Sequence, residues 1–191
     1  MLHKNEQHSK DEKRFVYEGT LDKVREFETV LDAFSKLKSD TWKLIISTRD
    51  IPYAQKMLEN YPHIKDHIEL CNAQTKEALI DLIAKADIGV ALLPDIPIYN
   101  ASTPVKVFDY YSSAVPCLMT RAEHIGTIFT DCDDAWFCDF TQDDISKKLE
   151  HLLSLSKDEV AKVGEHGQQR LLETRNYETI AKKIADQLEV L

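Results

Sequence analysis

The sequence lacks the features that mark secreted, zinc-binding and membrane proteins. Its four cysteines, Cys71, Cys117, Cys132 and Cys138, form no C-x-x-C pair. We therefore expect buried, reduced thiols and neither a disulfide framework nor a metal site. Apolar runs reach about six residues, far short of the roughly 20 that span a bilayer, and the N-terminus is too polar for a signal peptide. These absences predict a cytoplasmic protein.

Positive charge is also scarce, with 24 Lys and Arg residues against 33 Asp and Glu, a net charge of −9. This balance argues against general nucleic-acid binding, which needs a basic face, but allows an anionic ligand held by a few local cations. Repeats and low-complexity tracts are missing too. Residues 1–13 are polar and aperiodic, which predicts a disordered lead or linker remnant before one domain of residues 14–191.

Strand-like apolar segments alternate with helix-like segments along this domain. The predicted strands are Arg14–Tyr17, Trp42–Ser47, Ile68–Cys71, Ile88–Leu93, Pro116–Thr120 and Ala135–Cys138. The predicted helices cover 24–37, 51–60, 76–86 and 123–129, and others begin at the caps Thr103, Thr141, Ser156 and Asn176. Such alternation indicates βαβ units. We therefore predict an α/β, doubly wound (Rossmann-like) parallel sheet of about six strands with C-terminal helices.

The helix at Thr103 has the most informative sequence. Thr103 is a good N-cap, and Pro104 suits the first helical position, where an N–H is not needed. Helical spacing divides its residues into two faces. The face predicted to pack on the sheet holds Val105, Phe108 and Ser112, and the polar face holds Lys106, Asp109, Tyr110 and Ser113.

The polar face suits a nucleoside diphosphate. A helix N-terminus attracts phosphate, and Lys106 on the first turn adds a full positive charge. Asp109 lies six residues beyond Thr103, about 9 Å along the axis, which places a carboxylate within reach of ribose hydroxyls. An alternative is that Lys106 and Asp109 form a surface ion pair and meet no ligand.

Loops after other strands carry further candidates, because ligands bind beyond the strand C-termini of such sheets. Gly19 and Thr20 follow the first strand, and Gly19 lets a backbone approach a ligand closely. Arg25 follows them and could clamp phosphate oxygens, or could simply pair with Asp22 or Glu28 on the helix surface. The segment 72–74, beginning with Asn72, follows the third strand, and the loop 94–103 follows the fourth.

In this order the motifs resemble the C-terminal, donor-binding half of GT-B fold glycosyltransferases, the large retaining nucleotide-sugar family (glycosyl transferases group 1). The resemblance runs from about Phe15 to the C-terminus. Its carriers are Tyr17-Glu-Gly-Thr-Leu21 with Arg25, the strand 86–94, and Thr103-Pro-Val-Lys-Val-Phe-Asp-Tyr110 followed by Ala114-Val-Pro116, which is similar to the family's P-x-K-x-x-E-Y…G-x-P.

The resemblance implies a site and a reaction. Gly19, Thr20 and Asn72 would bind the donor, Arg25 and Lys106 would act on its diphosphate as catalytic residues, and no metal or cofactor is implied. Asp109 would bind the ribose with Tyr110 beside it, and Ser102 and Thr103 would hold the sugar. The sequence departs from the family at Asp109, where Glu is usual, and at Ala101, where the family has an acid.

The implied function is transfer of a hexose from a nucleoside-diphosphate sugar to an acceptor, in cell-surface polysaccharide biosynthesis. The acceptor-binding N-terminal domain would be missing from this chain, so the chain would be inactive alone and would meet a membrane only through that domain. Two alternatives stay open: a non-catalytic GT-B-like module that binds a nucleotide or a protein, and half of a sugar-nucleotide epimerase.

Overall fold

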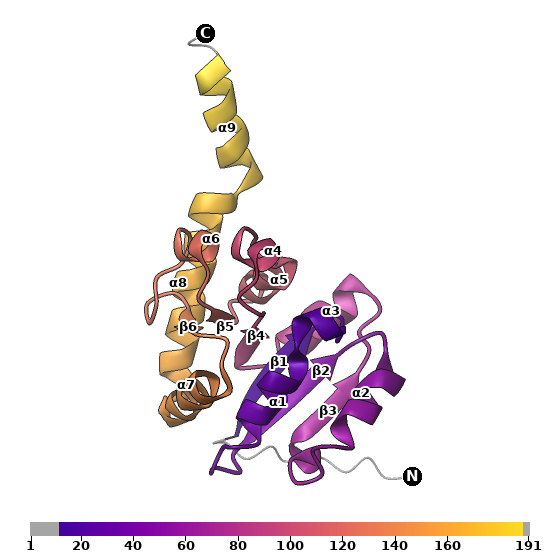
Figure 1. Cartoon of the computed structure of the whole chain (residues 1–191). Coiled ribbons are helices and arrows are strands. Elements are labelled where there is room, and N and C mark those ends of the chain that lie inside the picture. The colour runs from indigo at the N-terminus through magenta and orange to yellow at the C-terminus, as the bar shows by residue number, and fades with distance from the viewer. Residues whose placement is uncertain (1–11, 189–191) are drawn as a thin grey trace.

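Within residues 12–188, which the computed structural model describes, six parallel strands form one sheet in the order β3-β2-β1-β4-β5-β6 (Figure 1). The strands are β1 (Lys13–Glu18), β2 (Trp42–Ser47), β3 (Ile68–Cys71), β4 (Ile88–Ala91), β5 (Cys117–Thr120) and β6 (Trp136–Cys138). The predicted fold class is confirmed, and each strand lies within two residues of its predicted bounds. The predicted disordered lead lies outside the described residues up to residue 11.

Helices cover both faces of the sheet, as a doubly wound fold requires (Figure 1). They are η1 (Lys23–Arg25), α1 (Phe27–Phe34), α2 (Ile51–Leu58), η2 (Lys65–His67), α3 (Lys76–Ile83), α4 (Pro97–Asn100), α5 (Val105–Ser112), α6 (Glu123–Gly126), α7 (Gln142–Ser154), α8 (Lys157–Arg175) and α9 (Tyr177–Leu188). Successive strand side chains point to opposite faces. Phe15 and Tyr17 of β1 therefore join the core under α1, α2 and α7, whereas Val16 joins the core under α3 and α5.

The first predicted helix, over 24–37, is wrong in its opening turn. Residues 23–25 form the short 3₁₀ helix η1, and Glu26 then adopts φ 46°, which interrupts the chain before α1 begins at Phe27. Val24, expected to face inward, is 57% exposed. Apolar spacing alone does not reveal a left-handed residue between two helical segments, because the spacing continues through it.

The helix around Lys106 also differs from its prediction. It begins at Val105, and Pro104 is the N-cap with an extended ψ of 133°. Because the ψ of Pro104 is extended, Pro104 takes the N-cap position that was predicted for Thr103, and no side chain caps the helix. The predicted faces are rotated: Val105 is 74% exposed, while Lys106 and Tyr110 are buried against the sheet. The sheet packs against the helix face that carries the rings of Tyr110 and Tyr111. Helical spacing defined the possible faces but could not decide between them.

The N-caps predicted for two helices near the C-terminus of the chain are confirmed. Thr141 accepts a hydrogen bond from the Asp144 N–H at the start of α7, and Ser156 and Glu159 form a capping box at the start of α8. The final helix α9 extends away from the sheet and has no buried residue among those described (Figure 1). No helix in residues 12–188 combines the length and apolarity needed to cross a bilayer.

The cysteine prediction is partly wrong. Cys117 and Cys138 are buried and Cys71 is half-buried, but Cys132 is exposed. Cys132 lies in the turn before β6, where its φ is 65°.

Candidate functional site

The carboxyl end of β1 is the topological switch point of the sheet. β1 lies between β2 and β4, so the helices that follow β1 and β4 leave on opposite faces of the sheet. Ligands bind at such a topological switch point. A cleft of about 530 Å³ opens there, lined by the loops after β1, β2 and β3 and by the first turn of α3. It contains the predicted residues Gly19, Thr20, Asn72 and Asp109.

Lys106 is the most unusual side chain at this edge. It is 8% exposed, and its Nζ lies 3.7 Å from the centroid of the Tyr17 ring. Within the described residues, Nζ has no hydrogen-bond partner. Burial lowers the pKa of Lys106 to about 7, which the nearby Glu18 carboxylate only partly offsets. The Lys106 amine is therefore buried against an aromatic face, with the Glu18 carboxylate nearby and without a hydrogen-bond acceptor among the described residues.

Gly19 separates Lys106 from the cleft. Its φ of 131° lies in the region that side-chain-bearing residues rarely adopt, and a Cβ at this position would lie 3.4 Å from Lys106 Nζ. The backbone of Gly19 thus approaches Lys106 on one side and lines the cleft on the other. The predicted glycine and lysine, 87 residues apart in the sequence, are therefore neighbours.

Arg25 lies beside the same loop. Its Nη1 donates a hydrogen bond to Thr20 Oγ1 at 2.6 Å, and its Nε lies 3.7 Å from Asp22 Oδ2. Arg25 therefore pairs with Asp22, as the alternative interpretation of the sequence predicted. The guanidinium is nevertheless adjacent to the cleft through Thr20, and its charge contributes to lowering the pKa of Lys106.

Two carboxylates line the cleft, Glu18 and Asp109. Burial raises the pKa of Glu18, with Lys106 opposing and Asp109 adding to the rise. Burial likewise raises the pKa of Asp109, and the Lys76 ammonium opposes it. The predicted surface ion pair between Lys106 and Asp109 is not among the ion pairs of the described residues, and Asp109 instead faces the cleft with Lys76 across from it.

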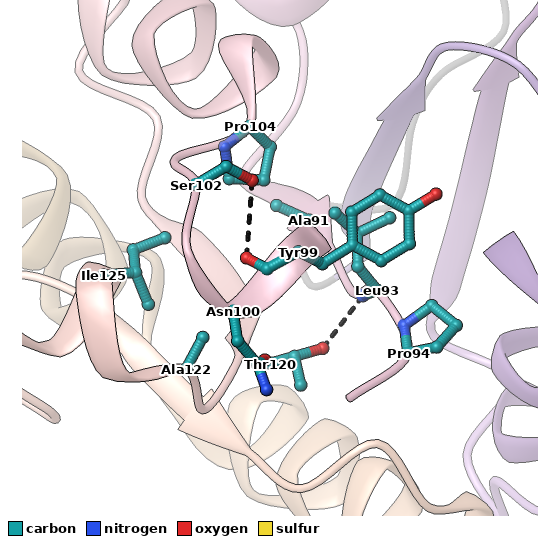
Figure 2. A pocket seen from close by; sticks show the side chains of 10 residues that line it. All are labelled: Ala91, Leu93, Pro94, Tyr99, Asn100, Ser102, Pro104, Thr120, Ala122 and Ile125. Atoms are coloured by element: carbon teal, nitrogen blue, oxygen red, sulfur yellow. Dashed lines mark hydrogen bonds between the residues drawn. The ribbon is translucent and has the colours of Figure 1, made fainter. Parts of the chain in front are cut away.

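Ser102 and Thr103 lie apart from this cleft. The Ser102 hydroxyl donates to the carbonyl oxygens of Ile98 and Tyr99, at 3.1 and 3.4 Å, and so closes the end of α4. Figure 2 shows the contact with Tyr99. Ser102 lines a small hollow between α4 and α6 of about 20 Å³, a volume large enough for about one water molecule. The Thr103 hydroxyl is buried and has no hydrogen-bond partner in the part of the chain that the structure describes.

The prediction that Tyr110 lies on the polar face of the helix is wrong. It is 0% exposed, and its hydroxyl contacts only backbone groups of β1 and β4 among the described residues. Two further residues that were not predicted, Arg49 in the loop after β2 and Lys76 in the first turn of α3, also line the cleft. Both are basic residues in segments that follow strands. Because ligands bind beyond the carboxyl ends of the strands, a search for basic residues in these segments would have identified them.

Comparisons with known proteins agree with this geometry. The model of the family "Glycosyl transferases group 1" matches residues 2–170. A search of curated proteins found no match. Among solved structures, HepE of Anabaena in complex with UDP and glucose superposes with a TM-score of 0.74 at 10% identity, covering 95% of this chain and 49% of that one.

Two further structures are similar. Sucrose-phosphate synthase of Thermosynechococcus elongatus has a TM-score of 0.75 at 14% identity, over 95% of this chain and 46% of that one. The C-terminal domain of a glycosyl transferase group 1 protein (LpcC) from Francisella tularensis has a TM-score of 0.70 at 12% identity, over 87% of both chains. The chain thus spans about half the length of the larger structures and matches a C-terminal domain nearly in full. With the family model covering most of its residues, the chain belongs to the glycosyl transferases group 1 family, as a domain with one half of the GT-B fold.

Proposed function

We propose that this domain holds the nucleoside-diphosphate sugar of a glycosyltransferase in the cleft at the ends of β1, β2 and β3. Gly19 and the first turn of α5 would receive the diphosphate, with Lys106 beneath it and Arg25 beside it. Asp109 would accept the ribose hydroxyls. Thr20 and Asn72 would contact the donor from the loops after β1 and β3.

The observation that carries this proposal is the buried amine of Lys106, for which the described residues offer no hydrogen-bond acceptor. An ammonium removed from water without an acceptor is strongly unfavourable, so the burial of this side chain is explained by a ligand of opposite charge. Gly19 lines the cleft, and a Cβ at this position would lie 3.4 Å from Nζ, so the Gly19 backbone adjoins both. A diphosphate on that backbone would supply the missing negative charge.

The similar structures support the choice of ligand. HepE was solved with UDP and with UDP-glucose, and TarM of S. aureus, similar with a TM-score of 0.74 at 13% identity, was solved with UDP. UDP is therefore the first probe to test on this chain. A hexose as the transferred sugar and a role in cell-surface polysaccharide synthesis stay predictions.

The chemistry that the chain's residues would supply is stabilisation of the departing diphosphate. Negative charge grows on the leaving group as the glycosidic bond breaks, and fixed positive charges lower the free energy of that state. Lys106 and Arg25 would act in this way without a metal ion. Transfer also requires an acceptor held in line and water excluded, which a second domain would provide. We therefore expect no transfer by this domain alone.

Titration calorimetry with UDP, ADP and GDP tests the proposal. At least one should bind with a dissociation constant below about 1 mM, and Lys106→Ala should weaken it about ten- to a hundredfold, the effect of losing a charged hydrogen-bond partner. Lys36→Ala is the control, because Lys36 pairs with Asp143 on the outer side of α1 and α7. Absence of binding by every nucleoside diphosphate contradicts the proposal.

A second candidate is a binding module without catalysis. Ala101, the C-cap of α4, is exposed, and its methyl side chain cannot hydrogen-bond a sugar as the family's acid would. The decisive measurement is transfer from UDP-sugars when a complementary N-terminal domain is joined to this chain. Tight nucleotide binding without transfer in that fusion favours the module.

A further inference from the structure

We propose that Tyr110 is a positioning residue for the diphosphate loop. Its hydroxyl links β1 to β4 where the two strands separate, and it thereby holds Glu18 and Gly19 in place over Lys106. This inference rests on the proposed function for its ligand. The hydrogen bonds of the Tyr110 hydroxyl are observed in the structure and do not depend on the ligand.

The link lies at the switch point of the sheet. β1 and β2 stay paired to the end of β1, through Glu18 and Ser47. The pairing of β1 with β4 ends earlier, at Val16 and Gly89. Beyond that point the Tyr110 hydroxyl accepts a hydrogen bond from the Glu18 N–H at 3.1 Å and donates one to the Val90 carbonyl at 3.3 Å. A side chain from α5 thus replaces the next rung of the ladder.

Gly89 makes this arrangement possible. A Cβ on Gly89 would lie 2.3 Å from Cδ2 of the Tyr110 ring, so the ring rests directly on the β4 backbone. Tyr110 is 0% exposed, and burial raises the pKa of its hydroxyl well above the usual value. The hydroxyl therefore stays protonated and can donate to one strand while it accepts from the other.

The consequence concerns the segment 17–20. Lys106 and Tyr110 are four residues apart on α5 and lie on one face of it. Lys106 lies over the Tyr17 ring, and Tyr110 holds the next backbone N–H. Gly19 N–H is bonded to the Ser47 carbonyl on the β2 side at 3.0 Å. The hydroxyl of Tyr110 is therefore the tether on the β4 side, and it sets the position of Gly19 relative to the Lys106 amine.

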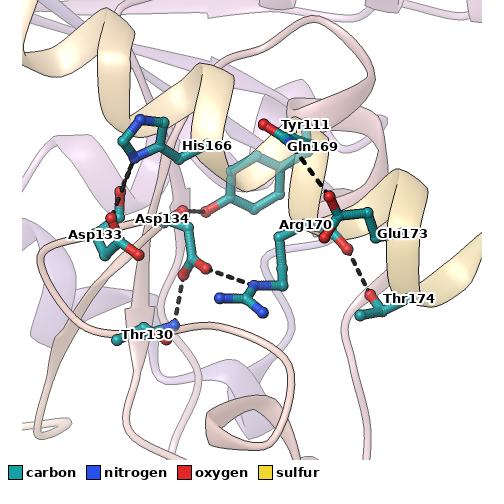
Figure 3. Close-up of polar contacts among 9 residues, drawn as sticks. All are labelled: Tyr111, Thr130, Asp133, Asp134, His166, Gln169, Arg170, Glu173 and Thr174. Atoms are coloured by element: carbon teal, nitrogen blue, oxygen red, sulfur yellow. Dashed lines mark hydrogen bonds and ion pairs between the residues drawn. The ribbon is translucent and has the colours of Figure 1, made fainter.

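The neighbouring Tyr111 offers a matched control. It is also 0% exposed, and its hydroxyl likewise contacts two backbone groups, donating to the Asp134 carbonyl at 2.5 Å and accepting from the Cys117 N–H at 3.4 Å. Figure 3 shows this hydroxyl among the contacts that join α5 to α8, where Arg170 also meets Asp134. None of these partners lines the cleft.

The test compares Tyr110→Phe with Tyr111→Phe. Each variant removes one buried hydroxyl with two backbone contacts, so the two should lose similar stability. Only Tyr110→Phe should weaken UDP binding in titration calorimetry, by about three- to tenfold, the range expected for one net hydrogen bond. Amide exchange should accelerate at Glu18 and Gly19 in Tyr110→Phe and stay unchanged there in Tyr111→Phe.

Two outcomes overturn the inference: equal loss of UDP affinity in both variants, or unchanged affinity and amide exchange in Tyr110→Phe. If the wild-type chain binds no nucleoside diphosphate, the proposed function fails, and the exchange rates still decide whether Tyr110 tethers the loop. If Tyr110→Phe does not fold, amide hydrogen exchange in the wild-type chain tests whether Tyr110 tethers the loop. Glu18 must then be protected to the same degree as Val16, and exchange at a loop-like rate refutes the tether.

Discussion

The burial of Lys106 predicts that nucleoside-diphosphate binding takes up a proton. The pKa of Lys106 is lowered to about 7 in the free protein, with burial as the largest cause. At pH 8 only about one-tenth of the molecules then carry the charged amine. A diphosphate beside Nζ favours the charged form, so binding at pH 8 should take up about 0.9 protons per ligand.

The same linkage fixes the pH dependence of affinity. Between pH 7 and 9 the charged fraction of free Lys106 falls from about one-half to about one-hundredth, so UDP affinity should fall by up to about 50-fold. The groups that act on Nζ are Tyr17 and Glu18 from β1, Arg25 from η1 and Cys117 from β5. Burial raises the pKa values of Tyr17 and of Cys117, so neither of these loses a proton first.

Calorimetry in two buffers with different ionisation enthalpies, HEPES and Tris, measures the proton uptake directly at pH 8. Lys106→Gln is the matched control, because it keeps a polar side chain of similar length that does not titrate. Its weaker UDP binding should show no proton uptake and little change between pH 7 and 9. Uptake close to zero in the wild-type chain, or equal pH dependence in the variant, refutes the reasoning.

Three further predictions follow from single residues. Asp109→Ala should weaken UDP binding about ten- to a hundredfold by calorimetry, because a carboxylate bonded to ribose hydroxyls is lost; affinity equal to wild type would remove Asp109 from the site. Gly164→Ala should lower the free energy of unfolding in urea by about 1–3 kcal/mol, because its Cβ would lie 2.0 Å from the Ala114 carbonyl oxygen. Gly126→Ala, whose Cβ meets no described atom within 4 Å, should be neutral or slightly stabilising. Between pH 7 and 9 the free energy of unfolding of the wild-type chain should rise relative to that of Lys106→Met. The reason is that the unfolded chain keeps a proton on Lys106 that the folded chain has lost. Equal pH dependence of unfolding in the two proteins would show that Lys106 stays charged.

Much of the fold could be predicted from local patterns. Strands such as Trp42–Ser47 are short apolar segments between turns, and the caps Thr141 and Ser156 form their hydrogen bonds within three residues. These features depend on groups that are close in the sequence, so the pattern contains the information. The cleft at the strand ends was predictable for a related reason, because alternating strands and helices determine which ends meet.

The chemistry of the site depended on contacts between distant segments. Helical spacing defined two stripes on α5, but only packing against β1 and β4 decided that Lys106 and Tyr110 face inward and Val105 faces solvent. The same packing places the Lys106 amine under Gly19, removes it from water and lowers its pKa. Desolvation is a property of everything that surrounds a group, so it follows from the tertiary structure and has no counterpart in residue spacing.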